Sequence, residues 1–136
     1  MILLDTNLVS ELMKPAPDPK VEHWFLLNEE ESALSAVTLG ELSYGVARLR
    51  ESARQRMLEA KLVEWRLRYA GRTLLYGSGA AWRYGRIQAD AECDGRPMSL
   101  PDAQIAAVAL EEDAALATRN VKDFERSGVR LVNPWA

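Results

Sequence analysis

With 136 residues, of which 48% are hydrophobic and 27% charged, the chain has the composition of a globular protein, and residues 1–136 are expected to form a single domain. The formal net charge of −3 gives no overall attraction for nucleic acid, and the single cysteine, Cys93, excludes an internal disulfide and a zinc site built on paired cysteines. No apolar run approaches membrane-spanning length and the N-terminus lacks a secretory pattern, so a cytoplasmic location without membrane contact is expected.

The predicted strands and helices alternate along the chain. In chain order, apolar spacing predicts a strand at 1–4, helices at 8–13 and 21–27, a strand at 33–37, helices at 39–49 and 52–69, a strand at 73–76, helices at 80–94 and 100–114, and strands at 115–118 and 129–132. Such alternation favours an α/β fold in which helices cover both faces of a central, mostly parallel sheet.

Four carboxylates, which we call the acidic cluster, stand at the ends or first turns of these elements: Asp5, Glu41, Asp102 and Asp123. Taken singly, each has an ordinary explanation, because an aspartate can cap a helix and a glutamate can sit in its solvated first turn. However, right-handed crossovers gather the carboxyl ends of parallel strands along one edge of a sheet, where ligands bind. We therefore expect the four side chains to lie close together.

Clustered carboxylates require either a proton or a cation. Two of them about 4 Å apart repel by about 4 kcal/mol at an effective dielectric constant of 20, so each raises the pKa of the other unless a cation binds. Oxygen ligands select a hard ion such as Mg²⁺ or Mn²⁺ over zinc. Such an ion can position a phosphate and activate water.

Four segments carry a family resemblance, and they follow one another over almost the whole chain. They are Ile2-Leu3-Leu4-Asp5-Thr6-Asn7, Ser35-Ala36-Val37-Thr38-Leu39-Gly40-Glu41-Leu42-Ser43-Tyr44-Gly45, Leu100-Pro101-Asp102-Ala103-Gln104-Ile105-Ala106-Ala107 and Ala117-Thr118-Arg119-Asn120-Val121-Lys122-Asp123-Phe124. Each segment alone is a weak signal. In this order they resemble the PIN-domain proteins, and among these the VapC toxins with their FitB-like branch.

The resemblance implies a PIN-like three-layer α/β/α sandwich and a Mg²⁺- or Mn²⁺-dependent endoribonuclease, the toxin of a toxin–antitoxin pair. Carried over, Asp5 and Asp102 would be the principal metal ligands, and Glu41 a third ligand or a group that orients water. Many relatives have an aspartate where this chain has Asn120, so Asp123 is expected to supply the fourth carboxylate.

Further roles and partners follow from the same resemblance. Thr6 and Thr118 would hydrogen-bond the metal ligands, and Arg119 would contact phosphate. The expected partners are an RNA substrate, a second copy of the chain, and a cognate antitoxin lying across the apolar helices of the N-terminal half. DNA would be bound only indirectly, through that antitoxin.

Other functions have weaker support from the residues. His23 is the only histidine and lies on a different predicted helix, and no Gly-x-Ser-x-Gly turn supports a catalytic triad. A phosphatase with Asp5 as covalent nucleophile would need a second aspartate where Asn7 stands. A non-catalytic protein-binding module stays open, with contacts made by the four tryptophans Trp24, Trp65, Trp82 and Trp135.

Overall fold

The computed structural model describes residues 1–136 and contains a five-stranded sheet in the order β3-β2-β1-β4-β5, with every neighbouring pair parallel. The strands are β1 (Ile2–Leu4), β2 (Ser32–Ser35), β3 (Thr73–Leu74), β4 (Ala115–Ala117) and β5 (Leu131–Val132). β1 lies at the centre, with Leu3 opposite Ala33 on one side and Leu4 opposite Ala117 on the other. The predicted α/β fold with a parallel central sheet is confirmed.

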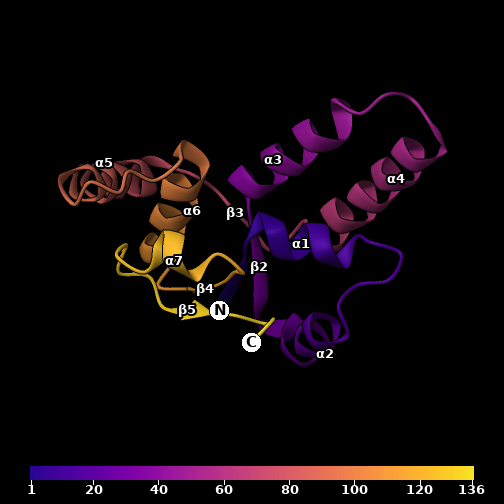
Figure 1. Cartoon of the computed structure of the whole chain (residues 1–136), viewed down its shortest axis with the longest axis horizontal. Helices are drawn as coiled ribbons and strands as arrows, with labels where there is room; N and C mark the ends of the chain where they lie inside the picture. Colours follow the sequence, from indigo (N-terminus) through magenta and orange to yellow (C-terminus); the bar gives the residue numbers. More distant parts are fainter.

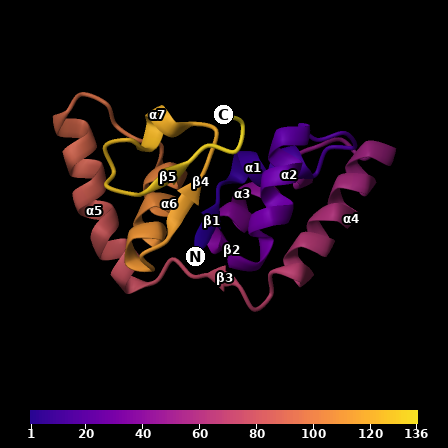
Figure 2. The same ribbon diagram turned by 90° about the horizontal axis from the view of Figure 1, so that it is seen from below.

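Seven α-helices surround the sheet (Figure 1). They are α1 (Thr6–Leu12), α2 (Pro19–Asn28), α3 (Ala36–Ala47), α4 (Ala53–Arg68), α5 (Ser78–Cys93), α6 (Leu100–Glu111) and α7 (Val121–Phe124), and a short 3-10 helix covers Glu29–Glu31. Figure 2 shows α1 to α4 gathered on one side of the sheet and α5 to α7 on the other. None of these helices has the length and apolar character needed to cross a membrane.

The three inner strands β2, β1 and β4 consist mostly of apolar residues because both of their faces are buried. Leu3, Ala33 and Leu116 point into one core, where they meet α5, α6 and α7. Their chain neighbours Leu4, Leu34 and Ala117 point into a second core, formed with α1, α2, α3 and α4. Burial of a leucine side chain contributes about 1.5–3 kcal/mol, so the two cores hold the helices on the sheet.

Several predicted boundaries were wrong, and local hydrogen bonds explain the differences. The strand expected at 33–37 ends at Ser35, because the Ser35 Oγ atom accepts a hydrogen bond from the Val37 N–H and so starts α3. The helix expected to reach Ala114 ends at Glu111, and Asp113 takes a left-handed conformation with φ 52°. The two edge strands β3 and β5 are shorter than expected, with two residues each.

Candidate functional site

Asp5 lies between the central strand and the first helix, where its carboxylate is 3% exposed. It is the N-cap of α1, as one of the ordinary explanations expected, and its Oδ1 atom accepts a hydrogen bond of 2.8 Å from the Thr6 N–H. Its Oδ2 atom accepts a hydrogen bond of 2.7 Å from the Thr118 hydroxyl group. Thr118 is at hand because it directly follows β4, which pairs with β1. Both oxygens of a buried carboxylate are therefore held by the chain.

Burial makes the charged form of Asp5 costly. It raises the pKa of this carboxyl group to about 6 from the ordinary 3.8, although the hydrogen bonds from Thr118 and Thr6 oppose the rise. The negative charges of Asp102 and Glu41 raise the pKa further. Near neutral pH, Asp5 is thus a carboxylate that would gain from a nearby cation.

Glu41 faces the same edge of the sheet from α3. It is half-buried, one residue before the buried Leu42, and its Oε1 atom accepts a hydrogen bond of 2.6 Å from the Thr6 hydroxyl group. The Thr6 Oγ1 atom also lies 3.2 Å from Thr38 Oγ1. Glu41 is the sixth residue of α3, so the alternative explanation as a solvated first-turn glutamate does not apply. Thr6, the residue that follows Asp5, thereby ties Glu41 to the start of α1.

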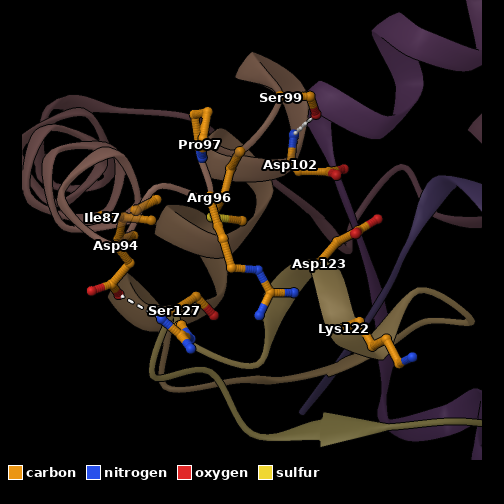
Figure 3. Close-up of a pocket in the computed structure, with 12 residues that line it drawn as sticks. Ile87, Asp94, Arg96, Pro97, Ser99, Asp102, Lys122, Asp123 and Ser127 are labelled. Carbon is orange, nitrogen blue, oxygen red and sulfur yellow. Dashed lines mark hydrogen bonds and ion pairs between the residues drawn. The ribbon is translucent and has the colours of Figure 1, made fainter.

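Asp102 reaches the site from the first turn of α6, but it does not cap this helix. The cap is Ser99, whose Oγ atom accepts a hydrogen bond of 3.2 Å from the Asp102 N–H. Burial raises the pKa of the half-buried Asp102 carboxyl group; the hydrogen bond with Ser99 lowers it, and the charges of Asp123 and Glu41 raise it. The carboxylates of Asp102 and Asp123 extend on the same side of the pocket (Figure 3).

Asp123 is exposed and lies within α7, so the alternative explanation of Asp123 as a helix cap does not apply. The N-cap position of α7 is occupied by Asn120, whose side chain makes no capping hydrogen bond. Asp102 and Asp123 both line a pocket of 260 Å³ between α5, α6 and α7, which we call the α6–α7 pocket. Its lining also includes the basic residues Arg96, Lys122 and Arg126.

The four carboxylates influence one another in pairs. Asp5 experiences the charges of Asp102 and Glu41, and Asp102 experiences those of Asp123 and Glu41. No three of the chain's histidine, cysteine and acidic side chains converge closely enough to hold a metal ion on their own. Mg²⁺ commonly binds through one or two carboxylates and keeps several waters. The all-oxygen donors and the raised pKa of Asp5 fit such an ion.

The remaining predicted site residues lie in the loop after β4. Thr118 is fully buried, and its Oγ1 atom accepts a hydrogen bond of 3.0 Å from the Asn120 N–H. Arg119 is exposed, with its guanidinium group 5.6 Å from the centre of the Trp135 ring. Asn7, which carried no role in the sequence prediction, joins this loop to α1: its Oδ1 atom accepts a hydrogen bond from the Arg119 N–H, and its amide donates one to Thr118, both 3.4 Å long.

Other residues near the acidic cluster were not singled out by the sequence prediction. Ser99 had a signal, because a serine three residues before an aspartate is a common start of a helix. Arg96 and Lys122 had none, since nothing in their local sequence indicates which pocket they line.

His23 is exposed on α2, apart from the acidic cluster. Among the tryptophans, Trp65 is buried, Trp24 and Trp135 pack against the same core, and Trp82 is 88% exposed.

Comparisons with known proteins agree with this geometry. The sequence model of the PIN domain family matches residues 2–128. Toxin FitB of Neisseria gonorrhoeae is 36% identical over 137 residues, covering 99% of both chains. VapC ribonuclease Y4jK of Sinorhizobium fredii is also 36% identical, covering 99% of this chain and 98% of its own. Among solved structures, that of FitAB bound to an IR36 DNA fragment superposes with a TM-score of 0.89 at 34% identity, covering 100% of this chain and 96% of its own.

Proposed function

The chain belongs to the PIN domain family, and from this premise we propose that it is a divalent-metal-dependent endoribonuclease that acts as the toxin of a toxin–antitoxin pair. One observation carries the proposal: Asp5, 3% exposed at the carboxyl edge of the sheet, has a pKa raised to about 6 by burial and further by the charges of Asp102 and Glu41. Relatives named as a ribonuclease and a toxin are similar along almost the whole chain, which supports one PIN-like domain over residues 1–136.

We assign the metal ion, Mg²⁺ or Mn²⁺, to Asp5 and Asp102. When bound, such an ion would offset the charge of an RNA phosphate and lower the pKa of water. The Thr118 hydroxyl and the Thr6 N–H keep the two Asp5 oxygens fixed for this task. Because the ligands are oriented before an ion arrives, binding needs little rearrangement of this side of the site.

Glu41 has the position of a group that orients the attacking water. Its Oε1 atom is occupied by the Thr6 hydroxyl, whereas its Oε2 atom has no hydrogen-bond partner within the chain. A half-buried carboxylate with one free oxygen can accept a hydrogen bond from water and take up a proton. Thr6 thus keeps Glu41 in place, and the free oxygen faces the water that attacks the phosphodiester.

The fourth charge of the site comes from Asp123 rather than from Asn120. Asp123 raises the pKa of Asp102, so its carboxylate acts on a proposed metal ligand. An asparagine in the position of Asn120 cannot supply charge, and this one makes no capping hydrogen bond. We propose that Asp123 supports the ion through a water molecule. Arg119, which is exposed on the loop beside Asp5, would contact an RNA phosphate.

A groove along α1, α3 and α4 offers a place for the antitoxin. Its 500 Å³ are lined by apolar residues such as Leu42, Val46 and Leu58, and its lining also includes Thr6 and Glu41. A peptide in this groove would bury apolar surface and close one side of the acidic cluster. The structure of FitAB bound to a DNA fragment is similar to this chain. For this chain we propose a cognate antitoxin, and we propose that DNA is contacted only through that antitoxin. We also propose that the chain forms a homodimer and acts in the cytoplasm.

The test is an RNA cleavage assay with the wild type and three single variants, all freed of copurifying protein. The substrates are purified tRNA and ribosomal RNA, each with Mg²⁺, with Mn²⁺ and with EDTA. Asp5→Asn and Asp102→Asn are expected to lower the cleavage rate at least about 100-fold, which corresponds to about 2.7 kcal/mol of transition-state stabilisation. Asp90→Asn is the matched control, because Asp90 is an exposed aspartate on α5 with only a 3.8 Å contact to Arg86.

Cleavage that persists in EDTA, or that is equal in the wild type and the two site variants, would overturn the nuclease proposal. A wild type that cleaves no RNA but binds its antitoxin as tightly as both site variants would favour the non-catalytic module. A covalent phosphate on Asp5 would instead favour the phosphatase.

A further inference from the structure

The α6–α7 pocket contains charges of both signs (Figure 3). Asp102 and Asp123 contribute negative charge, and three basic residues contribute positive charge: Arg96, Lys122 and Arg126. Arg126 is paired with Asp94, also of the pocket lining, at 3.3 Å. The other two basic residues, which we call the cationic pair, are therefore the ones left to act on a ligand.

The cationic pair has little to bind within the chain. Lys122 makes no salt bridge and no side-chain hydrogen bond, and it is exposed. Arg96 has one contact, with Glu125 at 3.5 Å, between side chains that are 50% and 47% exposed. Such surface pairs contribute about 0–1 kcal/mol. Arg96 is thus available to an anion at the pocket, and the exposed Lys122, whose ammonium group points away from Arg96 in Figure 3, can reach the same anion by rotation of its side chain.

The loop that carries Arg96 is held firmly. Gly95 adopts φ 70°, a conformation that glycine takes without strain, and the Arg96 N–H donates a hydrogen bond of 2.9 Å to the Ala91 carbonyl group. Two residues later, the Gln88 side chain accepts a hydrogen bond from the Met98 N–H at 3.0 Å and donates one to the Met98 carbonyl group at 2.8 Å. The backbone of Arg96 is fixed on both sides, which lowers the entropy lost when its side chain binds a ligand.

We propose that Arg96 and Lys122 bind the RNA phosphate next to the one that is cleaved, so that the strand runs from the acidic cluster into the α6–α7 pocket. This inference rests on the proposed function. A guanidinium group donates two parallel hydrogen bonds to a phosphate, and a lysine adds a compact charge beside it. An acidic cluster repels a polyanion everywhere except at its metal ion, so a second, cationic contact close by fixes the direction in which the RNA lies.

The test measures RNA binding separately from RNA cleavage. In an Asp5→Asn background, the affinity for a short fluorescein-labelled single-stranded RNA is measured by anisotropy with Mg²⁺ over a series of NaCl concentrations. Arg96→Gln and Lys122→Met are compared with Arg130→Gln, which removes one positive charge elsewhere on the surface. Arg130 directly precedes β5, at the end of the sheet opposite to the acidic cluster, and pairs there with Asp113 at 3.0 Å.

Loss of one phosphate contact is expected to reduce the slope of log affinity against log salt concentration by about 0.7 for single-stranded RNA. We expect this reduction for Arg96→Gln and for Lys122→Met, a weakening of affinity by about 3- to 10-fold, and no change of slope for Arg130→Gln. Arg96→Lys keeps the charge and should restore part of the slope, which also separates the effect from a folding defect.

Equal salt slopes for Arg96→Gln and Arg130→Gln would overturn the proposal. A loss of antitoxin binding with unchanged RNA binding would also overturn it, because the cationic pair would then bind the antitoxin. The outcome is independent of the nuclease test. A wild type that cleaves no RNA contradicts the proposed function, whereas a wild type that cleaves RNA while the slopes stay equal contradicts only the phosphate subsite.

Discussion

Asp5 and Asp102 both carry a carboxylate, but the surroundings of the two side chains in the fold differ. Asp5 is 3% exposed, and its two oxygens accept hydrogen bonds of 2.8 and 2.7 Å from Thr6 and Thr118. Asp102 is half-buried, lies in the first turn of a helix that Ser99 caps, and borders a pocket of 260 Å³. One side of the acidic cluster is closed and fixed, and the other is open toward solvent.

The difference separates two tasks within one site. The closed side holds a carboxylate in a costly charged state, which favours a bound cation. The open side combines two carboxylates with the cationic pair and leaves room for a ligand. Substitutions on the closed side should therefore change stability and metal affinity together, whereas substitutions on the open side should change mainly what the site binds.

The largest expected effect concerns stability on the closed side. The pKa of Asp5 is about 6 in the folded protein and ordinarily 3.8, so the folded state binds the proton more tightly. Without metal, the contribution of Asp5 to the free energy of unfolding is thus greatest below pH 3.8 and is lost as the pH rises through about 6. At pH 7.5 in EDTA, Asp5→Asn should stabilise the protein by about 2–3 kcal/mol, measured by urea unfolding.

Asp102→Asn provides the matched comparison for this measurement. Because Asp102 is less buried than Asp5, its replacement should raise the free energy of unfolding by less. The gain of Asp5→Asn should shrink when Mg²⁺ or Mn²⁺ is added, because the ion stabilises only the wild-type carboxylate. Equal unfolding free energies of the wild type and Asp5→Asn from pH 4 to pH 8 would contradict the burial argument.

On the open side, replacement of Asp123 should lower the rate of RNA cleavage more than replacement of Asn120. Asp123→Asn removes a charge that acts on Asp102 and is expected to lower the rate of RNA cleavage about 10-fold, or about 1.4 kcal/mol. Asn120→Ala should change the rate less than about 2-fold, since the Asn120 side chain makes no capping hydrogen bond. The measurement is the single-turnover rate at saturating Mg²⁺. A larger loss from Asn120→Ala than from Asp123→Asn would reverse the assignment of the fourth position.

The smallest expected effect tests what holds the closed side in place. Thr118→Val keeps the shape of the side chain but removes the hydroxyl group that donates to Asp5 and accepts from the Asn120 N–H. A lost hydrogen bond of this kind costs about 1 kcal/mol, and the pKa of Asp5 should rise further. Thr73→Val serves as control, because the Thr73 hydroxyl donates to the Tyr69 carbonyl group away from the site. A Thr118→Val protein whose unfolding free energy and pH dependence match the wild type would contradict this role.

The sequence determined the architecture and indicated the carboxylates that we propose for the site. The apolar runs that became β1, β2 and β4 are short and flanked by helical spacing, and this pattern is sufficient to predict a parallel sheet between helices. Asp5 could be placed at the carboxyl edge because it directly follows the first strand. The strand ends could not be predicted so well, because a single side chain such as Ser35 decides where a helix begins.

Only the tertiary structure decided how the carboxylates differ from one another. The pKa of Asp5 depends on burial and on Thr118, which is 113 residues away in the chain. Glu41 was predicted as a ligand, but its bond to Thr6 arises from the packing of α1 beside α3. Arg96 and Lys122 belong to a turn and a short helix with no local signal, and they share a pocket only because α5, α6 and α7 pack on the same face of the sheet. Local sequence fixes where a strand stops, whereas charge, burial and pocket shape depend on residues that meet across the fold.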